Sequence, residues 1–114
     1  MLKKVRREWL LRSFFKITTP LGVSVRCSRA YWSFIVTRKH PVLSGQENGV
    51  REALSDPDEI RRSRKDPNVL LFYRESSPRW ICAIIRRQNG EAFLITAYPT
   101  DAIKAGERIW TKSK

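Results

Sequence analysis

Hydrophobic positions recur with a helical spacing in the first half of this chain and with a strand-like alternation in the second half. Tyr31 and Ile35 lie four residues apart and follow Ser28, a residue type that often caps helices, so a helix of about three turns is predicted here. Pro41 disfavours helical geometry in the residue before it. The helix is therefore expected to end near His40, the only histidine of the chain.

A second, shorter helix is predicted between Ser44 and Pro57. Ser44 and Glu47 have the spacing of a capping box. The apolar residues that follow recur at helical intervals, at Val50, Ala53 and Leu54. Pro57 ends this helix, and Asp56 before it is a cap that predicts one further helical turn with Ile60 as its apolar anchor.

Four stretches have the composition or the alternation of β-strands. They are Val23 to Cys27, Val69 to Arg74, Trp80 to Arg87 and Glu91 to Tyr98, the last three being rich in β-branched and aromatic residues. Asn89-Gly90 between the last two is a strong hairpin signal. Because the helical patterns precede the three adjacent strands, we expect an α+β fold in which N-terminal helices pack on one face of a four-stranded antiparallel sheet.

Alternate residues of the last strand are expected on opposite faces of the sheet. On this rule Phe93, Ile95 and Ala97 share one face, and Leu94, Thr96 and Tyr98 share the other. After Pro99 the residues from Thr100 to Gly106 predict a short helix that ends at the glycine.

The N-terminal segment carries apolar residues among many lysines and arginines. From Leu2 to Lys16 the spacing of Leu2, Val5 and Trp9 predicts a basic amphipathic helix. Pro20 then breaks the pattern. We expect residues 1–20 to form a basic, helical N-terminal extension and residues 21–114 to form a single domain, which is the natural size for one modest core.

The charge of the chain narrows the choice of partners. Its 114 residues carry 23 Lys and Arg against 11 Asp and Glu, which gives a formal net charge of +12. A field of this strength attracts polyanions and favours RNA or another nucleic acid as the partner. No apolar run reaches membrane-spanning length, so we expect no membrane partner and a cytoplasmic location.

The two cysteines, Cys27 and Cys82, lie inside apolar runs and have no CxxC or Cys/His spacing near them. Buried free thiols are the default for such residues in a reducing compartment. A structural zinc ion would need two more ligands than the sequence supplies. We therefore expect no metal and no other cofactor.

Several short motifs occur in the order found in one nuclease family. Trp32 precedes His40-Pro41-Val42-Leu43, the segment ALSDPDEIRRS ends at Ser63, and FLITAYPTDAIKAGE begins at Phe93. From about Val23 to Trp110 the chain resembles the phage and bacterial branch of the barnase/EndoU/colicin/RelE-like (BECR fold) nucleases. The resemblance implies a metal-independent ribonuclease, often deployed as a toxin or effector, whose active site lies on the open face of the sheet.

One position departs from the pattern of this family. Members often carry a histidine two residues after the tryptophan, and this chain has Phe34 there. With His40 alone, a mechanism that uses two histidines as acid and base is excluded. Another group must take the second role, or the activity has been lost.

RNA cleavage without a metal needs a base for the ribose 2′-hydroxyl, an acid for the leaving 5′-oxygen and cations for the phosphate. His40 can fill one of the first two roles, and a tyrosine can stack on a base or pass a proton. The basic run that begins at Arg61 holds a hydroxyl among guanidiniums, which suits a phosphate. The candidate catalytic residues, expected to converge in one cleft, are His40, Arg62, Ser63, Thr96 and Tyr98. The candidate RNA-binding residues are Arg61, Arg64, Lys65, Tyr73, Arg74 and Lys104.

Simpler interpretations exist for the same residues. His40 is also an ordinary capping residue for a helix C-terminus, and the run from Arg61 to Asp66 is also typical of a solvated face. The chain as a whole is compatible with a module that binds RNA or another nucleic acid without cutting it. A third interpretation is an interaction domain whose basic surface meets an acidic partner, such as an antitoxin or immunity protein.

Overall fold

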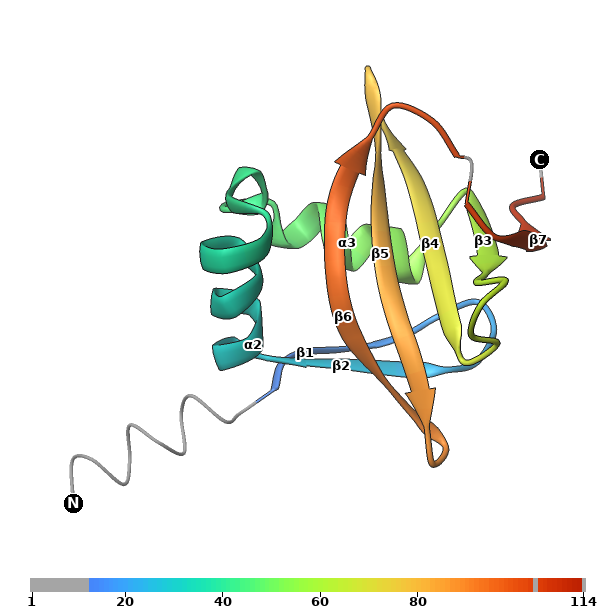
Figure 1. The fold of residues 1–114 in the computed structure, drawn as a ribbon, viewed down its shortest axis with the longest axis horizontal. Helices are drawn as coiled ribbons and strands as arrows, with labels where there is room; N and C mark the ends of the chain where they lie inside the picture. Colours follow the sequence, from blue (N-terminus) through green and yellow to red (C-terminus); the bar gives the residue numbers. More distant parts are fainter. Residues whose placement is uncertain (1–12, 104, 114) are drawn as a thin grey trace.

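A computed structural model describes residues 13–103 and 105–113, which form one mixed seven-stranded sheet with helices beside it (Figure 1). The strands are β1 (Ser13–Thr18), β2 (Ser24–Ser28), β3 (Glu59–Arg62), β4 (Val69–Ser76), β5 (Arg79–Gln88), β6 (Glu91–Thr100) and β7 (Glu107–Thr111). Their order across the sheet is β1-β2-β6-β5-β4-β3-β7. Every neighbouring pair is antiparallel except β2 and β6, which are parallel.

The helical segments lie in the first half of the described chain. They are the α-helix α2 (Arg29–Phe34), the π-helix η1 (Ile35–Lys39), the 3₁₀-helix η2 (Pro41–Leu43) and the α-helix α3 (Glu47–Ser55). Ser28 caps α2 as expected, since its hydroxyl accepts a hydrogen bond of 3.1 Å from the Tyr31 N–H. Within residues 13–103 and 105–113 no helix is long and apolar enough to cross a membrane.

The expected four-stranded antiparallel sheet is wrong, because three additional strands join it and one pairing is parallel. Residues 13–16, expected in the N-terminal helix, belong to β1, while residues 1–12 lie outside the described part of the chain. Ile60, expected to anchor a helical turn, lies in β3. That strand forms because it has a partner on each side, β4 and β7, and ladder hydrogen bonds on both edges outweigh a weak local preference.

The hydrophobic core lies between α3 and one face of the sheet. Ile60, Phe72, Ala83 and Ala97 form a row of register partners across β3, β4, β5 and β6, and each is fully buried. α3 supplies the opposing residues Val50, Ala53 and Leu54, also fully buried. Figure 1 shows α3 on the far side of β4 and β5, with β1 and β2 crossing at a steep angle to them. The opposite face of β4, β5 and β6 is therefore left without a helical layer.

β2 covers only the beginning of β6. The parallel pairing consists of two residue pairs, Val25 with Ala92 and Arg26 with Phe93. Beyond them β2 turns into α2, and α2 with η1 runs beside the edge of β6 (Figure 1). The Tyr31 hydroxyl donates a hydrogen bond of 2.6 Å to the Ile95 carbonyl, so a side chain replaces the missing strand partner at this edge.

A β-bulge at Ile95 changes which side chains of β6 face the core. Ile84 pairs with Thr96 but Ile85 pairs with Leu94, so Ile95 is the extra residue. A bulge reverses the alternation of faces along its strand. Leu94 is buried, whereas Phe93, expected to share a face with Ala97, lies on the opposite face and is 41% exposed.

The link from β6 to β7 packs closely against β3. The helix predicted from Thr100 to Gly106 does not form in the described residues: Thr100 ends β6, and the residues after it are irregular. Gly106 has φ of +84°, and a Cβ atom on it would lie 2.7 Å from the Arg62 carbonyl oxygen. Only glycine tolerates this combination of backbone conformation and close approach.

Two glycines with the same backbone conformation allow a stability test of this contact. Gly22 also has positive φ, but a Cβ atom on it would meet no atom within 4 Å. We expect Gly22→Ala to cost about 1 kcal/mol of unfolding free energy and Gly106→Ala at least about 2 kcal/mol, because the second adds a clash to the backbone strain. Urea unfolding of both variants measures the difference. Equal losses would show that the link does not press on β3.

Candidate functional site

Two tyrosines and a cysteine form a row across the helix-free face of the sheet. Tyr73 on β4 pairs with Cys82 on β5, and Cys82 pairs with Tyr98 on β6. Tyr73 and Cys82 are buried with Leu71 in a cluster separate from the main core, and Tyr98 packs against this cluster while remaining half-buried. Ile103 from the β6–β7 link also packs there. The row is therefore covered at Tyr73 and more open at Tyr98.

Burial keeps the polar groups of this row protonated. It raises the pKa of the Cys82 thiol to about 11, against the opposing effect of the neighbouring hydroxyls of Tyr98 and Tyr73. It raises the pKa of Tyr98 to about 12 and moves that of Tyr73 further upward. At neutral pH the Tyr98 hydroxyl is therefore protonated and carries no charge.

His40 lies beside Tyr98 at the open end of the row. The ring centroids are 5.7 Å apart, with an angle of 55° between the ring planes. His40 follows η1, and its backbone N–H bonds to the Ile35 carbonyl at 2.8 Å, which closes the wide π-helical turn. Such turns are rare and often occur at functional sites, because the added residue redirects the side chains that follow. His40 is partly exposed.

Lys39, which directly precedes His40 and was not among the expected residues, turns its side chain toward the edge of β6. Its ammonium group donates hydrogen bonds to the Ile95 carbonyl at 3.3 Å and to the Tyr31 hydroxyl at 3.4 Å. It also lies 5.6 Å from the centroid of the Phe34 ring, which is 44% exposed. The signal that marks it is the pair Arg38-Lys39 directly before the only histidine, although that pattern alone does not tell which of the two cations turns toward β6.

Thr96 shares the face of Tyr98 but differs from the expected phosphate donor. Its hydroxyl oxygen is buried and has no hydrogen-bond partner in the described structure. A buried orphan hydroxyl is costly and cannot reach a ligand without movement of its surroundings. Thr96 therefore shapes the floor of the site, and its hydroxyl does not point to a ligand.

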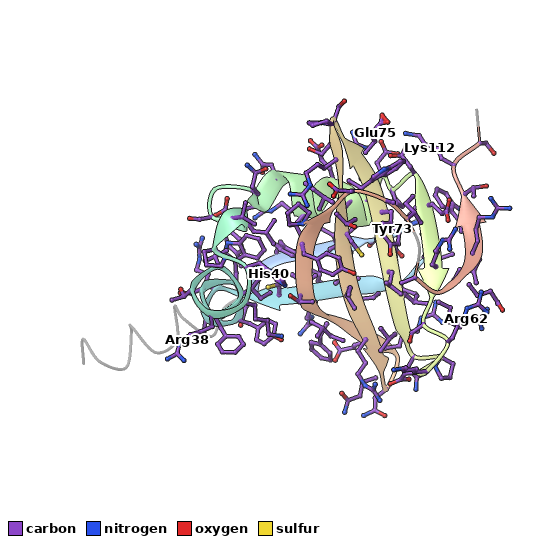
Figure 2. The ribbon with its side chains drawn as sticks, turned by 45° about the horizontal axis from the view of Figure 1, so that its top comes forward. Arg38, His40, Arg62, Tyr73, Glu75 and Lys112 are labelled. Carbon is purple, nitrogen blue, oxygen red and sulfur yellow. The ribbon has the colours of Figure 1, made fainter. Side chains whose placement is uncertain are left out.

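The basic run that follows β3 is not brought to His40. Figure 2 shows His40 beside β6 and Arg62 near the opposite edge of the sheet, by β3. Three strand spacings separate β6 from β3, about 14 Å. Arg62 pairs with Glu107, and the Ser63 hydroxyl accepts hydrogen bonds from the backbone N–H groups of Lys65 and Asp66. Of the residues expected to converge, the structure brings His40 to Tyr98 and places Arg62 and Ser63 elsewhere.

The remaining candidates are also distributed over the molecule. Arg64 and Lys65 are exposed in the β3–β4 loop, and Arg74 is held by Asp56 and Glu52 near the end of α3. Lys104 lies outside the described residues. Arg61 is half-buried at the far end of the tyrosine row, where its guanidinium bonds to Glu59 at 2.5 Å and to the Gly106 carbonyl at 3.3 Å. The Arg61 side chain therefore links β3 to the β6–β7 link, next to the buried Tyr73.

The site consequently has the parts of a small acid–base centre. An imidazole can accept or donate a proton, a tyrosine hydroxyl can donate one, and a lysine ammonium carries a positive charge. In residues 13–103 and 105–113 no three His, Cys, Asp or Glu side chains lie together as a metal site requires.

The buried thiols give a direct test of the pKa values on this face and in the core. Burial raises the pKa of Cys82 from 9.0 to about 11 and that of Cys27 from 9.0 to about 12. Below these values both thiols stay protonated in the folded chain, so at about pH 8 we expect alkylation by iodoacetamide to be at least ~100-fold slower than in urea. Mass spectrometry of each cysteine peptide over time measures the rates. A native Cys82 that reacts at the unfolded rate would show that the tyrosine row is open.

Comparison of the chain with models of protein families, with curated proteins and with solved structures gave no match in any of the three. The site is therefore interpreted from its own geometry and charge.

Proposed function

We propose that this chain is a metal-independent endoribonuclease of the toxin or effector type, with His40, Tyr98 and Lys39 at its centre. The observation that carries the proposal is the contact between the only histidine and a neutral tyrosine, with rings 5.7 Å apart on the helix-free face of the sheet. RNA supplies both of its own reacting groups, the 2′-hydroxyl and the adjacent phosphate. A protein that cleaves it needs only to move protons and stabilise charge.

In the proposed reaction His40 takes the proton of the 2′-hydroxyl, whose oxygen forms a bond to the phosphorus atom. The bond from phosphorus to the 5′-oxygen breaks, and that oxygen takes the proton of the Tyr98 hydroxyl. The products are a 2′,3′-cyclic phosphate and a 5′-hydroxyl end. A pKa of about 12 leaves Tyr98 protonated before the reaction, and an alkoxide leaving group is still the stronger base, so the transfer is downhill.

Lys39 fits the role expected earlier of Arg62 and its neighbours. The phosphate gains negative charge in the transition state, and a fixed cation stabilises that charge best where it is already held in place. The Lys39 ammonium is held by two hydrogen bonds to Ile95 and Tyr31, while the net charge of +12 draws RNA to the surface. The proposal includes a cytoplasmic location, where RNA is available. An acidic antitoxin or immunity protein would bind the same basic surface.

Substitution of the two proton-transfer residues tests the mechanism. We expect His40→Ala and Tyr98→Phe each to lower the rate of cleavage of a labelled RNA by about 10²- to 10⁴-fold in EDTA, because each removes one proton transfer. RNA affinity should change little in both variants. Arg62→Ala is the control, since it removes a cation that lies three strands away and should leave the rate nearly intact.

The outcomes separate the nuclease from a binding module. If the wild-type chain binds RNA but does not cleave it, and His40→Ala binds equally well, the chain is an RNA-binding module and the acid–base assignment is wrong. If Arg62→Ala is as defective as His40→Ala, the reaction takes place near the β3–β4 loop.

Binding should depend steeply on salt if phosphates are the main contacts. Four cations lie on or beside the face of β6 that carries the site, namely Lys16, Arg26, Lys39 and Arg86. For single-stranded RNA each phosphate contact adds about −0.7 to the slope of log affinity against log salt concentration, so four predict a slope of about −3. Titrations at several salt concentrations measure it. A slope near zero would exclude a polyanionic ligand.

A further inference from the structure

A hollow lies where β2 parts from β6, next to the proposed acid–base centre. Its volume is about 530 Å³, within the range of small-ligand sites. β2 contributes Arg26 and Ser28, α2 contributes Tyr31, β5 contributes Arg86, and β6 contributes Phe93. The hollow exists because only two residue pairs join β2 to β6 before the chain turns into α2.

Phe93 gives this hollow a flat apolar wall. The bulge at Ile95 turns the Phe93 side chain away from the core, and 41% of it is exposed. A large aromatic side chain left in contact with water gains stability when a flat ligand covers it. Every nucleobase has such a face, and stacking on an aromatic residue is the usual way in which proteins hold an unpaired base.

Two arginines border the same hollow. Arg26 pairs with Phe93 across the strands, and so does Arg86 from the other side, which places the three side chains in one row. No Asp or Glu is among the described residues that line the hollow. Arg26 contacts Glu91 at 3.5 Å and Arg86 contacts Asp66, but these partly exposed pairs contribute little stability. A phosphate can therefore compete for the guanidiniums.

The hollow adjoins the residues that hold the Lys39 side chain. Tyr31 and Ile95 line it, and the same two residues hold the Lys39 ammonium through the Tyr31 hydroxyl and the Ile95 carbonyl. Phe93 and Tyr98 are about 13 Å apart along β6, because the bulged residue Ile95 adds little length and four residue steps of about 3.3 Å remain. One extended strand of nucleic acid can span that length.

We propose that this hollow binds one unstacked nucleotide of a single-stranded RNA, with its base on Phe93 and an adjacent phosphate at Arg26 and Arg86. The inference rests on the proposed function, and it restricts the substrate to single strands. A base inside a duplex is stacked on both sides and has no face to offer Phe93. The nucleotide bound at Phe93 anchors the RNA strand in this hollow. This anchoring determines which phosphate of the strand lies at His40.

The test uses the full chain and a short labelled 2′-O-methyl oligonucleotide, which lacks the hydroxyl that attacks and so remains intact. Fluorescence anisotropy measures its affinity as a single strand and as a duplex. We expect Phe93→Ala and Phe93→Leu to weaken single-strand binding by about 10-fold or more, Phe93→Trp to keep it, and none to alter duplex binding. Phe93→Leu keeps an apolar side chain, so its defect would be due to the lost ring.

A matched pair of arginines provides the control for charge. Arg26 and Arg79 are similarly exposed, at 44% and 47% of the side chain, and each pairs with one carboxylate, Glu91 or Asp101. Only Arg26 lines the hollow. We expect Arg26→Ala to lower the steepness of the salt dependence by about 0.7 and to weaken single-strand binding more than Arg79→Ala does.

The results distinguish failure of this inference from failure of the proposed function. If the wild-type chain does not bind RNA at all, the proposed function falls. If it binds and cleaves RNA while Phe93→Ala binds single strands as tightly as the wild type, only the hollow is wrongly assigned. If Phe93→Ala weakens binding although the wild type does not cleave RNA, the nucleotide site is supported and the proposed ribonuclease activity is wrong. Equal effects of Arg26→Ala and Arg79→Ala would overturn the placement of the phosphate.

Discussion

The open edge of β6 is the constraint on which the rest of the site depends. A backbone carbonyl at the edge of a sheet needs a partner when it is removed from water. β2 accompanies β6 for only two residue pairs, and the Ile95 carbonyl beyond them is satisfied by the Tyr31 hydroxyl and the Lys39 ammonium. These bonds hold α2 and η1 against the strand. The residue that follows Lys39 is His40, which is thereby set beside Tyr98.

The two faces of the sheet have different roles. One face buries the apolar row from Ile60 to Ala97 under α3, and this core fixes the positions of β4, β5 and β6. The other face carries polar groups, but burial under the β6–β7 link keeps them neutral up to Tyr98. The proposed chemistry is therefore placed at the Tyr98 end of the row, beside the π-helical turn. The buried part of the row holds Tyr98 in place through contact with Cys82, whose partner in turn is Tyr73.

Local patterns predicted the elements whose hydrophobic alternation is long enough to stand alone. β4, β5, β6, their hairpin at Asn89-Gly90 and the helix α3 were all expected near their observed positions. β3 could not be predicted, because one isoleucine among charged residues forms a strand only when distant partners pair with it. His40 and Tyr98, which the structure places side by side, were expected to lie together on the basis of residue type and the family resemblance. Lys39 and the exposed Phe93 were missed because a π-helical turn and a bulge each shift a side chain by one position, and neither leaves a signal in the sequence.

The parallel pairing of β2 with β6 also has a consequence for the order in which the chain folds. The strands β3 to β6 are joined by short links and can pair as soon as they are made, whereas β2 must find a strand more than sixty residues further along the chain. α2 and η1 are attached to β2, so Tyr31, Lys39 and His40 reach β6 only when this late, long-range contact closes. A chain whose β1 and β2 have detached from β6 can keep the pairings of β3 to β7, but its His40 no longer lies beside Tyr98. Under the proposed function, docking of the first two strands is therefore the step that assembles the acid–base pair.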